Sequence, residues 1–162
     1  MVSEADMSMV MVMIGAPQEA PWWHAPGSRA LHQAVPMLDD RNTKEHPHIG
    51  PFAVWSRDDN ETGRTALLGE DRVGGPDIKA TEAAGRAIVA DVEGLPPTYM
   101  DVGQLDICVE EDLRYAQLPC QAGVPCELHL TPGLPHGGEA FIPSEAIAVD
   151  IMSKRFQAMT SF

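Results

Sequence analysis

The sequence predicts an α/β fold in which helices flank a parallel sheet, preceded by an irregular N-terminal segment. Two short stretches, 98–102 (TYMDV) and 126–131 (CELHLT), have the apolar or alternating composition of strands. Each is followed by a helical pattern, at 110–122 and after Ser144. The order strand, helix, strand, helix is typical of parallel strands that are joined by crossover helices.

The other expected elements are shorter. The apolar run 9–14 (MVMVMI) suits a buried strand, whereas 17–29 holds three prolines and two adjacent tryptophans without any period and suits a loop. Ser56 is the expected N-cap of a short helix that ends near Leu68. A brief helical segment is expected at 81–90.

Two of the helical patterns carry finer expectations. The acids at 110–112 complement a helix N-terminus, an interpretation favoured over a bound cation, and Pro119 should end or kink that helix. Ser144 should cap the C-terminal helix. The apolar face of that helix is expected to carry Ile147, Ile151 and Phe156.

Length and charge restrict the classes of partner. The chain has 162 residues, enough for one compact domain with a core. Its 11 Lys and Arg against 24 Asp and Glu give a formal net charge of -13. Nucleic acids and anionic membranes both require concentrated positive charge, so neither is an expected partner.

The cysteines and the N-terminus indicate a compartment. Cys108, Cys120 and Cys126 cannot all pair with one another, and their spacing fits no common zinc pattern, so we expect free thiols in a reducing environment. The apolar run near the N-terminus is too short to span a bilayer, and it follows Glu4 and Asp6 instead of basic residues. A cytoplasmic protein without a membrane span is predicted.

A potentially catalytic residue follows each of the two predicted strands. Asp106 lies in the loop after 98–102, and His136 lies in the loop after 126–131. Both loops belong to the carboxyl edge of a parallel sheet, where such folds place their sites. A carboxylate there could hold an imidazole in the tautomer of a general base. Alternatively, Asp106 caps the following helix and His136 is a turn residue, and spacing alone leaves both interpretations open.

Several motifs resemble the hormone-sensitive-lipase-like branch of the α/β-hydrolase-fold carboxylesterases. Gly103-Gln104-Leu105-Asp106 resembles the string that supplies the triad acid in that family, and Pro135-His136-Gly137 resembles the string that supplies the base. The likeness includes VPMLDDRN, ALLG and GGPD upstream and covers about the last four-fifths of the chain. It implies the C-terminal portion of an α/β-hydrolase fold. Two departures are Ile107-Cys108 after the acid, and Gly138, which could loosen the loop of the base.

The nucleophile of such a site is not found. The family uses a serine in a G-x-S-x-G elbow, and the sequence contains neither that string nor an HGGG-type string; Ser28, in PGSRA, is a poor substitute. One hypothesis is that the gene's reading frame shifts at the serine codon, at Pro17, and is restored before Val35. The alternative is a divergent loop, and the codons for 17–24 distinguish the two.

These observations give one overall prediction. Residues 1–34 form a divergent or disordered segment with a strand near 9–14, and 35–162 form the C-terminal part of the hydrolase domain. The resemblance implies a carboxylic ester hydrolase that keeps Asp106 and His136, takes a small ester as substrate and needs no cofactor or metal, but is weak or inactive alone. His46 and His48 are expected to lie in a solvated turn. The alternative function is a non-catalytic remnant that acts as a binding or interaction module.

Overall fold

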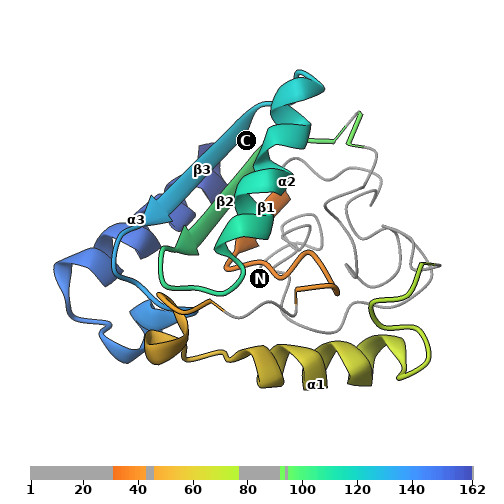
Figure 1. Ribbon diagram of the computed structural model, residues 1–162. Coiled ribbons are helices and arrows are strands. Elements are labelled where there is room, and N and C mark those ends of the chain that lie inside the picture. Colours follow the sequence, from red (N-terminus) through yellow and green to blue (C-terminus); the bar gives the residue numbers. More distant parts are fainter. Residues whose placement is uncertain (1–30, 43–45, 77–91, 94, 162) are drawn as a thin grey trace, which may run out of the picture.

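The central feature of the fold is a small parallel sheet. The computed structural model describes residues 31–42, 46–76, 92–93 and 95–161 (Figure 1). Within this part of the chain, β1 (Leu31–Ala34), β2 (Thr98–Gly103) and β3 (Cys126–Thr131) run parallel in the order β1-β2-β3. All residues of β2 are buried, because this strand has a neighbour on either side.

Two helices cover opposite faces of the sheet. The helix α2 (Val109–Gln121) follows β2, and α3 (Ala146–Ser161) follows β3. Side chains alternate along a strand, and here Met100 packs in one cluster with Tyr115 of α2, whereas Asp101 is hydrogen-bonded by Arg155 of α3. Figure 1 accordingly shows α2 in front of the strands and α3 behind them. The main core lies under α2.

The helix α1 (Arg57–Leu68) begins where the sequence predicts. Ser56 and Asp59 form a reciprocal capping box, with the Ser56 Oγ accepting from the Asp59 N–H at 3.1 Å and an Asp59 oxygen accepting from the Ser56 N–H at 3.0 Å. Asn60 of α1 donates to the carbonyl of Asn42, whose side chain donates to the carbonyl of Ile107. These bonds connect α1 to the loop that follows β2.

The strand predictions at 98–102 and 126–131 and the helix prediction at 110–122 are confirmed, with one difference at Pro119. The helix α2 does not end at this proline but continues to Gln121. Pro119 is buried, and its carbonyl accepts the N–H of Val124 at 2.8 Å, so the proline packs in the core and still takes part in the turn after the helix. Proline lacks the N–H that would donate to the carbonyl four residues earlier, so the last turn of α2 has one helical hydrogen bond fewer.

The predicted cap of α3 is wrong, and of its predicted apolar face only Ile151 is buried. The helix begins at Ala146, so Ser144 lies before the cap position, and Ile147 and Phe156 are 38% and 59% exposed. The face that meets the sheet carries Ala148, Ile151, Arg155 and Ala158, at helical spacing. Arg155 sets this phase, because its ion pair with a residue of β2 requires it to point at the sheet.

One strand was not predicted from the sequence. β1 lies inside the segment 1–34, which was expected to be irregular, and its four residues pair with 98–101 of β2. The predicted strand at 9–14, the loop at 17–29 and the helical segment at 81–90 lie outside the described residues. Among the described residues, no helix is both long and apolar enough to cross a membrane.

Candidate active site

The carboxylate of Asp106 is held rigidly at the end of β2. Its backbone N–H donates to the carbonyl of Gly103 at 3.2 Å, and its Oδ1 accepts the N–H of Cys108 at 2.9 Å. The residue is only 1% exposed. One carboxylate oxygen is therefore occupied by the backbone of its own loop, which leaves the other for a second partner.

That second partner is the imidazole of His136. Its Nδ1 lies 2.8 Å from Oδ2 of Asp106. A carboxylate can only accept, so Nδ1 carries the proton and, in the neutral ring, Nε2 is the basic nitrogen. The side chain of His136 is 20% exposed, and no described residue hydrogen-bonds its Nε2. The alternative roles, a helix cap and an isolated turn residue, do not account for this pairing across 30 positions of sequence.

The two loops are fixed to each other by their backbones. The N–H of Leu105 donates to the carbonyl of Leu134 at 2.9 Å, and the N–H of Gln104 donates to the carbonyl of Thr131 at 2.9 Å. A Cβ atom at Gly103 would lie 2.1 Å from the carbonyl oxygen of Leu134, so only glycine allows this approach. The string before Asp106 thus attaches the acid loop to the base loop.

Gly138 does not loosen the base loop, contrary to expectation. The residue is buried at the start of a short 3-10 helix, Gly138–Phe141, and its N–H donates to the carbonyl of Pro135 at 3.0 Å. A Cβ there would lie 2.8 Å from Pro135 Cδ and 3.0 Å from a methyl of Leu134. The side chains of Leu134 and Pro135 occupy the space that a side chain at position 138 would need.

Sequence reasoning missed Trp55, which lies against the base. Its ring centroid is 6.0 Å from that of His136, with the planes tilted by 32°. Trp55 directly precedes the N-cap Ser56, and its ring also contacts Gly63 of α1, where an added Cβ would be 3.4 Å away. An aromatic residue just before a capping box was the only available signal, because the contact with His136 spans 81 positions.

A buried ion cluster supports the base loop from behind and was also missed. Arg155 donates to both oxygens of Asp101, at 2.7 and 2.6 Å, and to Glu139 at 2.7 Å. Burial opposes the charge of Arg155, but its hydrogen bonds and attraction to Asp101 prevail and raise the pKa of the guanidinium. Because Glu139 follows His136 by three residues, this cluster joins the base loop to β2 and α3.

The acidic run at 110–112 is only partly a solvated helix N-terminus. Glu110 is exposed and pairs with Arg114 at 2.9 Å, as expected. Glu111 is buried and accepts the N–H of Leu38 at 2.6 Å, and burial raises the pKa of its carboxyl to about 7. Asp112 is fully buried, and burial followed by the proximity of Glu111 raises its pKa well above the usual value. Two of the three acids therefore point into the protein.

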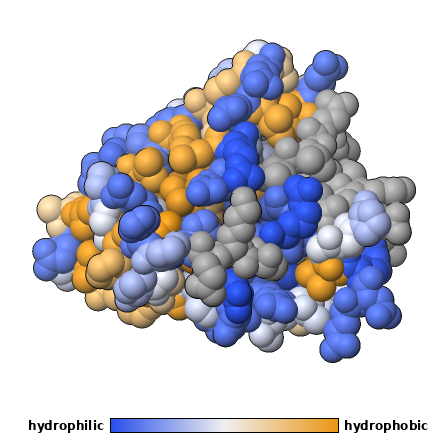
Figure 2. Space-filling model, viewed as in Figure 1, coloured by the Kyte–Doolittle hydropathy of each residue, from blue (hydrophilic) through white to orange (hydrophobic). Residues whose placement is uncertain are grey.

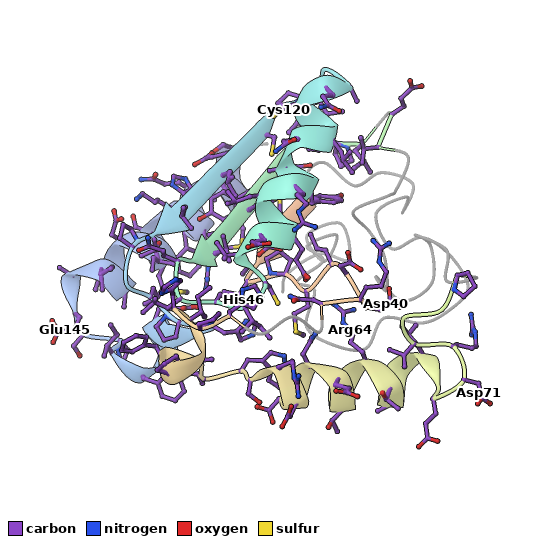
Figure 3. The ribbon with its side chains drawn as sticks, in the orientation of Figure 1. Asp40, His46, Arg64, Asp71, Cys120 and Glu145 are labelled. Atoms are coloured by element: carbon purple, nitrogen blue, oxygen red, sulfur yellow. The ribbon has the colours of Figure 1, made fainter. Side chains whose placement is uncertain are left out.

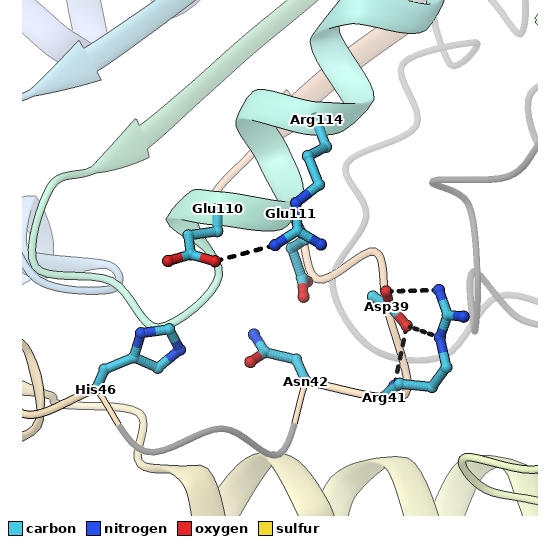
Figure 4. Close-up of a pocket in the computed structure, with 7 residues that line it drawn as sticks. All are labelled: Asp39, Arg41, Asn42, His46, Glu110, Glu111 and Arg114. Atoms are coloured by element: carbon cyan, nitrogen blue, oxygen red, sulfur yellow. Dashed lines mark hydrogen bonds and ion pairs between the residues drawn. The ribbon is translucent and has the colours of Figure 1, made fainter.

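The predicted histidine turn adjoins a small polar pocket. His46 lines it, and His48 is exposed. Figure 4 shows that the charged side chains lining this pocket largely bind each other, as in the Arg41–Asp39 pair at 2.8 Å. Among the described residues, no group of three His, Cys, Asp or Glu side chains could hold a metal ion. The pocket is lined by Asp39, Arg41, Asn42, His46, Glu110, Glu111 and Arg114.

Comparisons with known proteins identify the family of the fold. Residues 7–139 match the model of a family described as alpha/beta hydrolase fold. A bacterial heroin esterase is similar with a TM-score of 0.70 and 28% identity, over 81% of this chain and 41% of that one. The esterase LipW from Mycobacterium marinum shares the fold with a TM-score of 0.67 and 23% identity, over 83% of this chain and 40% of that one. An esterase from the bacterial hormone-sensitive lipase family shares it with a TM-score of 0.70 and 17% identity, over 84% of this chain and 44% of that one.

The matched structures are much longer than this chain. It spans 41% of the heroin esterase, 40% of LipW and 44% of the third esterase. A comparison with curated proteins finds no significant match.

Proposed function

Because the chain belongs to the α/β-hydrolase fold family, we propose that Asp106 and His136 are the acid and the base of a carboxylic ester hydrolase site. The observation that carries this proposal is the 2.8 Å contact between His136 Nδ1 and a carboxylate that is buried and already held by its own loop. Such a carboxylate sets the tautomer and orientation of an imidazole, which is its role in a catalytic triad.

The proposed chemistry follows from the roles of the two groups. In an esterase of this family, a serine attacks the ester carbonyl. Nε2 of His136 would take the serine proton and return it to the leaving alcohol, while Asp106 would stabilise the imidazolium that forms between the two steps. A small carboxylic ester is the proposed substrate, and neither step requires a cofactor.

We further propose that this chain has little or no esterase activity by itself. Its sequence holds no G-x-S-x-G elbow, and loss of the nucleophile lowered kcat on the order of 10⁶-fold in a serine protease. A histidine and an aspartate alone cannot form the acyl-enzyme. If the reading frame is disrupted at Pro17, the nucleotides that encode residues 17–24 will spell a serine elbow when they are translated in a frame shifted by one base. Nucleotides that spell no such elbow would contradict the frameshift hypothesis.

The hydrolysis of p-nitrophenyl butyrate tests the activity proposal. The purified chain and its H136A variant should hydrolyse this ester at the same low rate, as should H48A, a control at an exposed histidine. Turnover well above that of free imidazole that disappears in H136A and persists in H48A would show that the chain contains a working nucleophile. That result would overturn the proposed inactivity and support the role of His136.

A non-catalytic binding role is the second candidate. It is favoured by Val149, Met152 and Phe156, which are exposed and lie at helical spacing along α3, since contiguous exposed apolar area marks interaction sites. Size-exclusion chromatography and thermal melting show whether the chain is a stand-alone module or a remnant that needs a partner. A cooperative melt of a monomer would support an adapted stand-alone module, and aggregation would support a remnant that needs a partner. The exposed large apolar side chains of the described residues are Phe52, Val54, Leu113, Leu130, Phe141, Ile142, Ile147, Val149, Met152 and Phe156.

A cytoplasmic location is part of the proposal. Cys108, Cys120 and Cys126 are all free thiols, and Cys120 is exposed. Exposed free thiols persist most readily where the surroundings keep them reduced. Fractionation of cells that produce the tagged chain tests this location.

A further inference from the structure

Two of the three cysteines lie together where α2 leads into β3. Cys120 is in the last turn of α2, and Cys126 is the first residue of β3. The connection folds back tightly, because the N–H of Gly123 donates to the carbonyl of Cys120 at 3.3 Å and the N–H of Val124 donates to that of Pro119 at 2.8 Å. Gly123 has a φ of 72°, which makes the reversal possible. The turn brings the end of the helix over the start of the strand.

The two thiols share one groove on the surface. Cys120 and Cys126 line a depression between α2 and β3, together with Leu113, Ala116 and Leu128. Figure 3 places Cys120 at the end of α2, and Figure 2 shows apolar residues over β3 and beside α2. Cys120 is exposed and Cys126 is half-buried, so a small reagent reaches Cys120 first.

The Cys120 thiol also affects the titration of Cys126. The pKa of Cys126 is raised to about 11, by burial first and then by the neighbouring Cys120 thiol. Cys126 is therefore a protonated thiol at neutral pH and attacks a dissolved reagent slowly, whereas its attack on a bond at the neighbouring Cys120 is intramolecular. Cys108 is 0% exposed and lies in the loop after β2, away from this turn.

We propose that Cys120 and Cys126 are a dithiol pair that a low-molecular-weight disulfide closes into an intramolecular disulfide. The thiolate of Cys120 attacks one sulfur of the reagent, forms a mixed disulfide and expels one reagent thiolate. Cys126 then loses its proton to solvent and attacks the Cys120 sulfur, which expels the second reagent thiolate. Two protein thiols are oxidised, one reagent disulfide is reduced to two thiols, and the protons pass to the expelled thiolates.

The position of this bond separates it from the proposed esterase site. Cys126 is paired with Thr98, the first residue of β2, whereas Asp106 and His136 follow the opposite ends of β2 and β3. The disulfide would join the end of α2 to the amino edge of the sheet. Its formation is therefore independent of the acid–base pair, and neither proposal depends on the other.

The reduced full-length chain provides a direct test. It is incubated with oxidised glutathione and acid-quenched. It is then unfolded in guanidinium chloride and alkylated with excess iodoacetamide at alkaline pH, so that buried Cys108 also reacts, and digested with trypsin. Both cysteines fall in the single tryptic peptide 115–154, and Cys108 falls in another. We expect peptide 115–154 to lose two hydrogen atoms and carry no alkyl group, while the peptide of Cys108 is alkylated. Closure should also occur in C108S.

Two variants make the test specific. In C126S the first step remains and the second is removed, so a stable glutathione adduct should accumulate on Cys120. In C120S the exposed thiol is lost, and modification should be much slower than in the unaltered chain. A stable glutathione adduct on the unaltered chain, or disulfide-linked dimers in place of internal closure, would overturn the proposal. Because the main result comes from the unaltered chain, it does not depend on whether a variant folds.

Discussion

Replacing Asp106 with asparagine should reverse the tautomer of His136 without changing the shape of the site. The two oxygens of Asp106 have different partners: Oδ1 accepts the N–H of Cys108 at 2.9 Å, and Oδ2 faces Nδ1 of His136 at 2.8 Å. A carboxylate accepts at both positions. A carboxamide accepts at one and donates at the other, so it must choose between the two partners.

The buried backbone decides that choice. If the carboxamide oxygen stays on the N–H of Cys108, its NH₂ group faces Nδ1 of His136, which must then be unprotonated. The opposite orientation leaves the buried N–H of Cys108 without an acceptor, which costs about 1–3 kcal/mol. That cost corresponds to a preference of about 5- to 150-fold for the first orientation. The proton should therefore move to Nε2, which can no longer act as a base.

Two-bond ¹⁵N–¹H correlation spectra of histidine-labelled protein measure the tautomer directly. At a pH where imidazole is neutral, His136 should show the Nδ1–H form in the unaltered chain and the Nε2–H form in D106N, with signals assigned by their loss in H136Q. The control is D71N, at an exposed aspartate, which should leave the tautomer unchanged. An Nδ1–H form that persists in D106N would refute the reasoning.

Three further changes probe the supports of the site and its buried acids. G103A should lower the free energy of unfolding by about 1–3 kcal/mol in urea titrations, because the new methyl lies 2.1 Å from a carbonyl oxygen of the base loop; G50A, with open space around it, should not. R155M should cost about 3–5 kcal/mol by leaving buried Asp101 unpaired, and R155M/D101N should recover part of this loss. The raised pKa of Glu111 means that the folded state binds its proton more tightly, so stability should fall as pH rises from about 4.5 to about 7, and E111Q should flatten that fall.

Local signals in the sequence were sufficient for most elements of the fold. The composition of 126–131 and the N-cap signal at Ser56 act over a few residues, and the structure has the strand and the cap at the predicted positions. The phase of α3 was mispredicted because it depends on an ion pair between Arg155 and a strand 54 positions away. β1 was missed because its four residues form a strand only through pairing with β2.

In the candidate site, too, the residues that local patterns mark could be predicted, and those that depend on a distant partner could not. Asp106 and His136 could be found because each follows a recognisable strand, so their positions required only that the strands be parallel and adjacent. Trp55 and Glu139 could not be found in this way. Each acts through a partner that is distant in sequence, and no short pattern records such a contact.

The arrangement of the acid and the base does not depend on a nucleophile. The hydrogen bonds that hold the pair and join its two loops directly, from the Asp106–Cys108 contact to the Leu105–Leu134 contact, connect residues of the segment 103–138, and the supporting ion cluster adds only Asp101, Glu139 and Arg155. A chain can therefore lose its serine and still hold His136 in the tautomer of a general base. The tautomer of His136 and the hydrolysis of an ester then measure different properties. The first shows whether the acid–base half of the site is intact, and the second shows whether the site is complete. An inactive chain with an Nδ1–H imidazole is the outcome expected if both proposals, the acid–base pair and the lost nucleophile, are right.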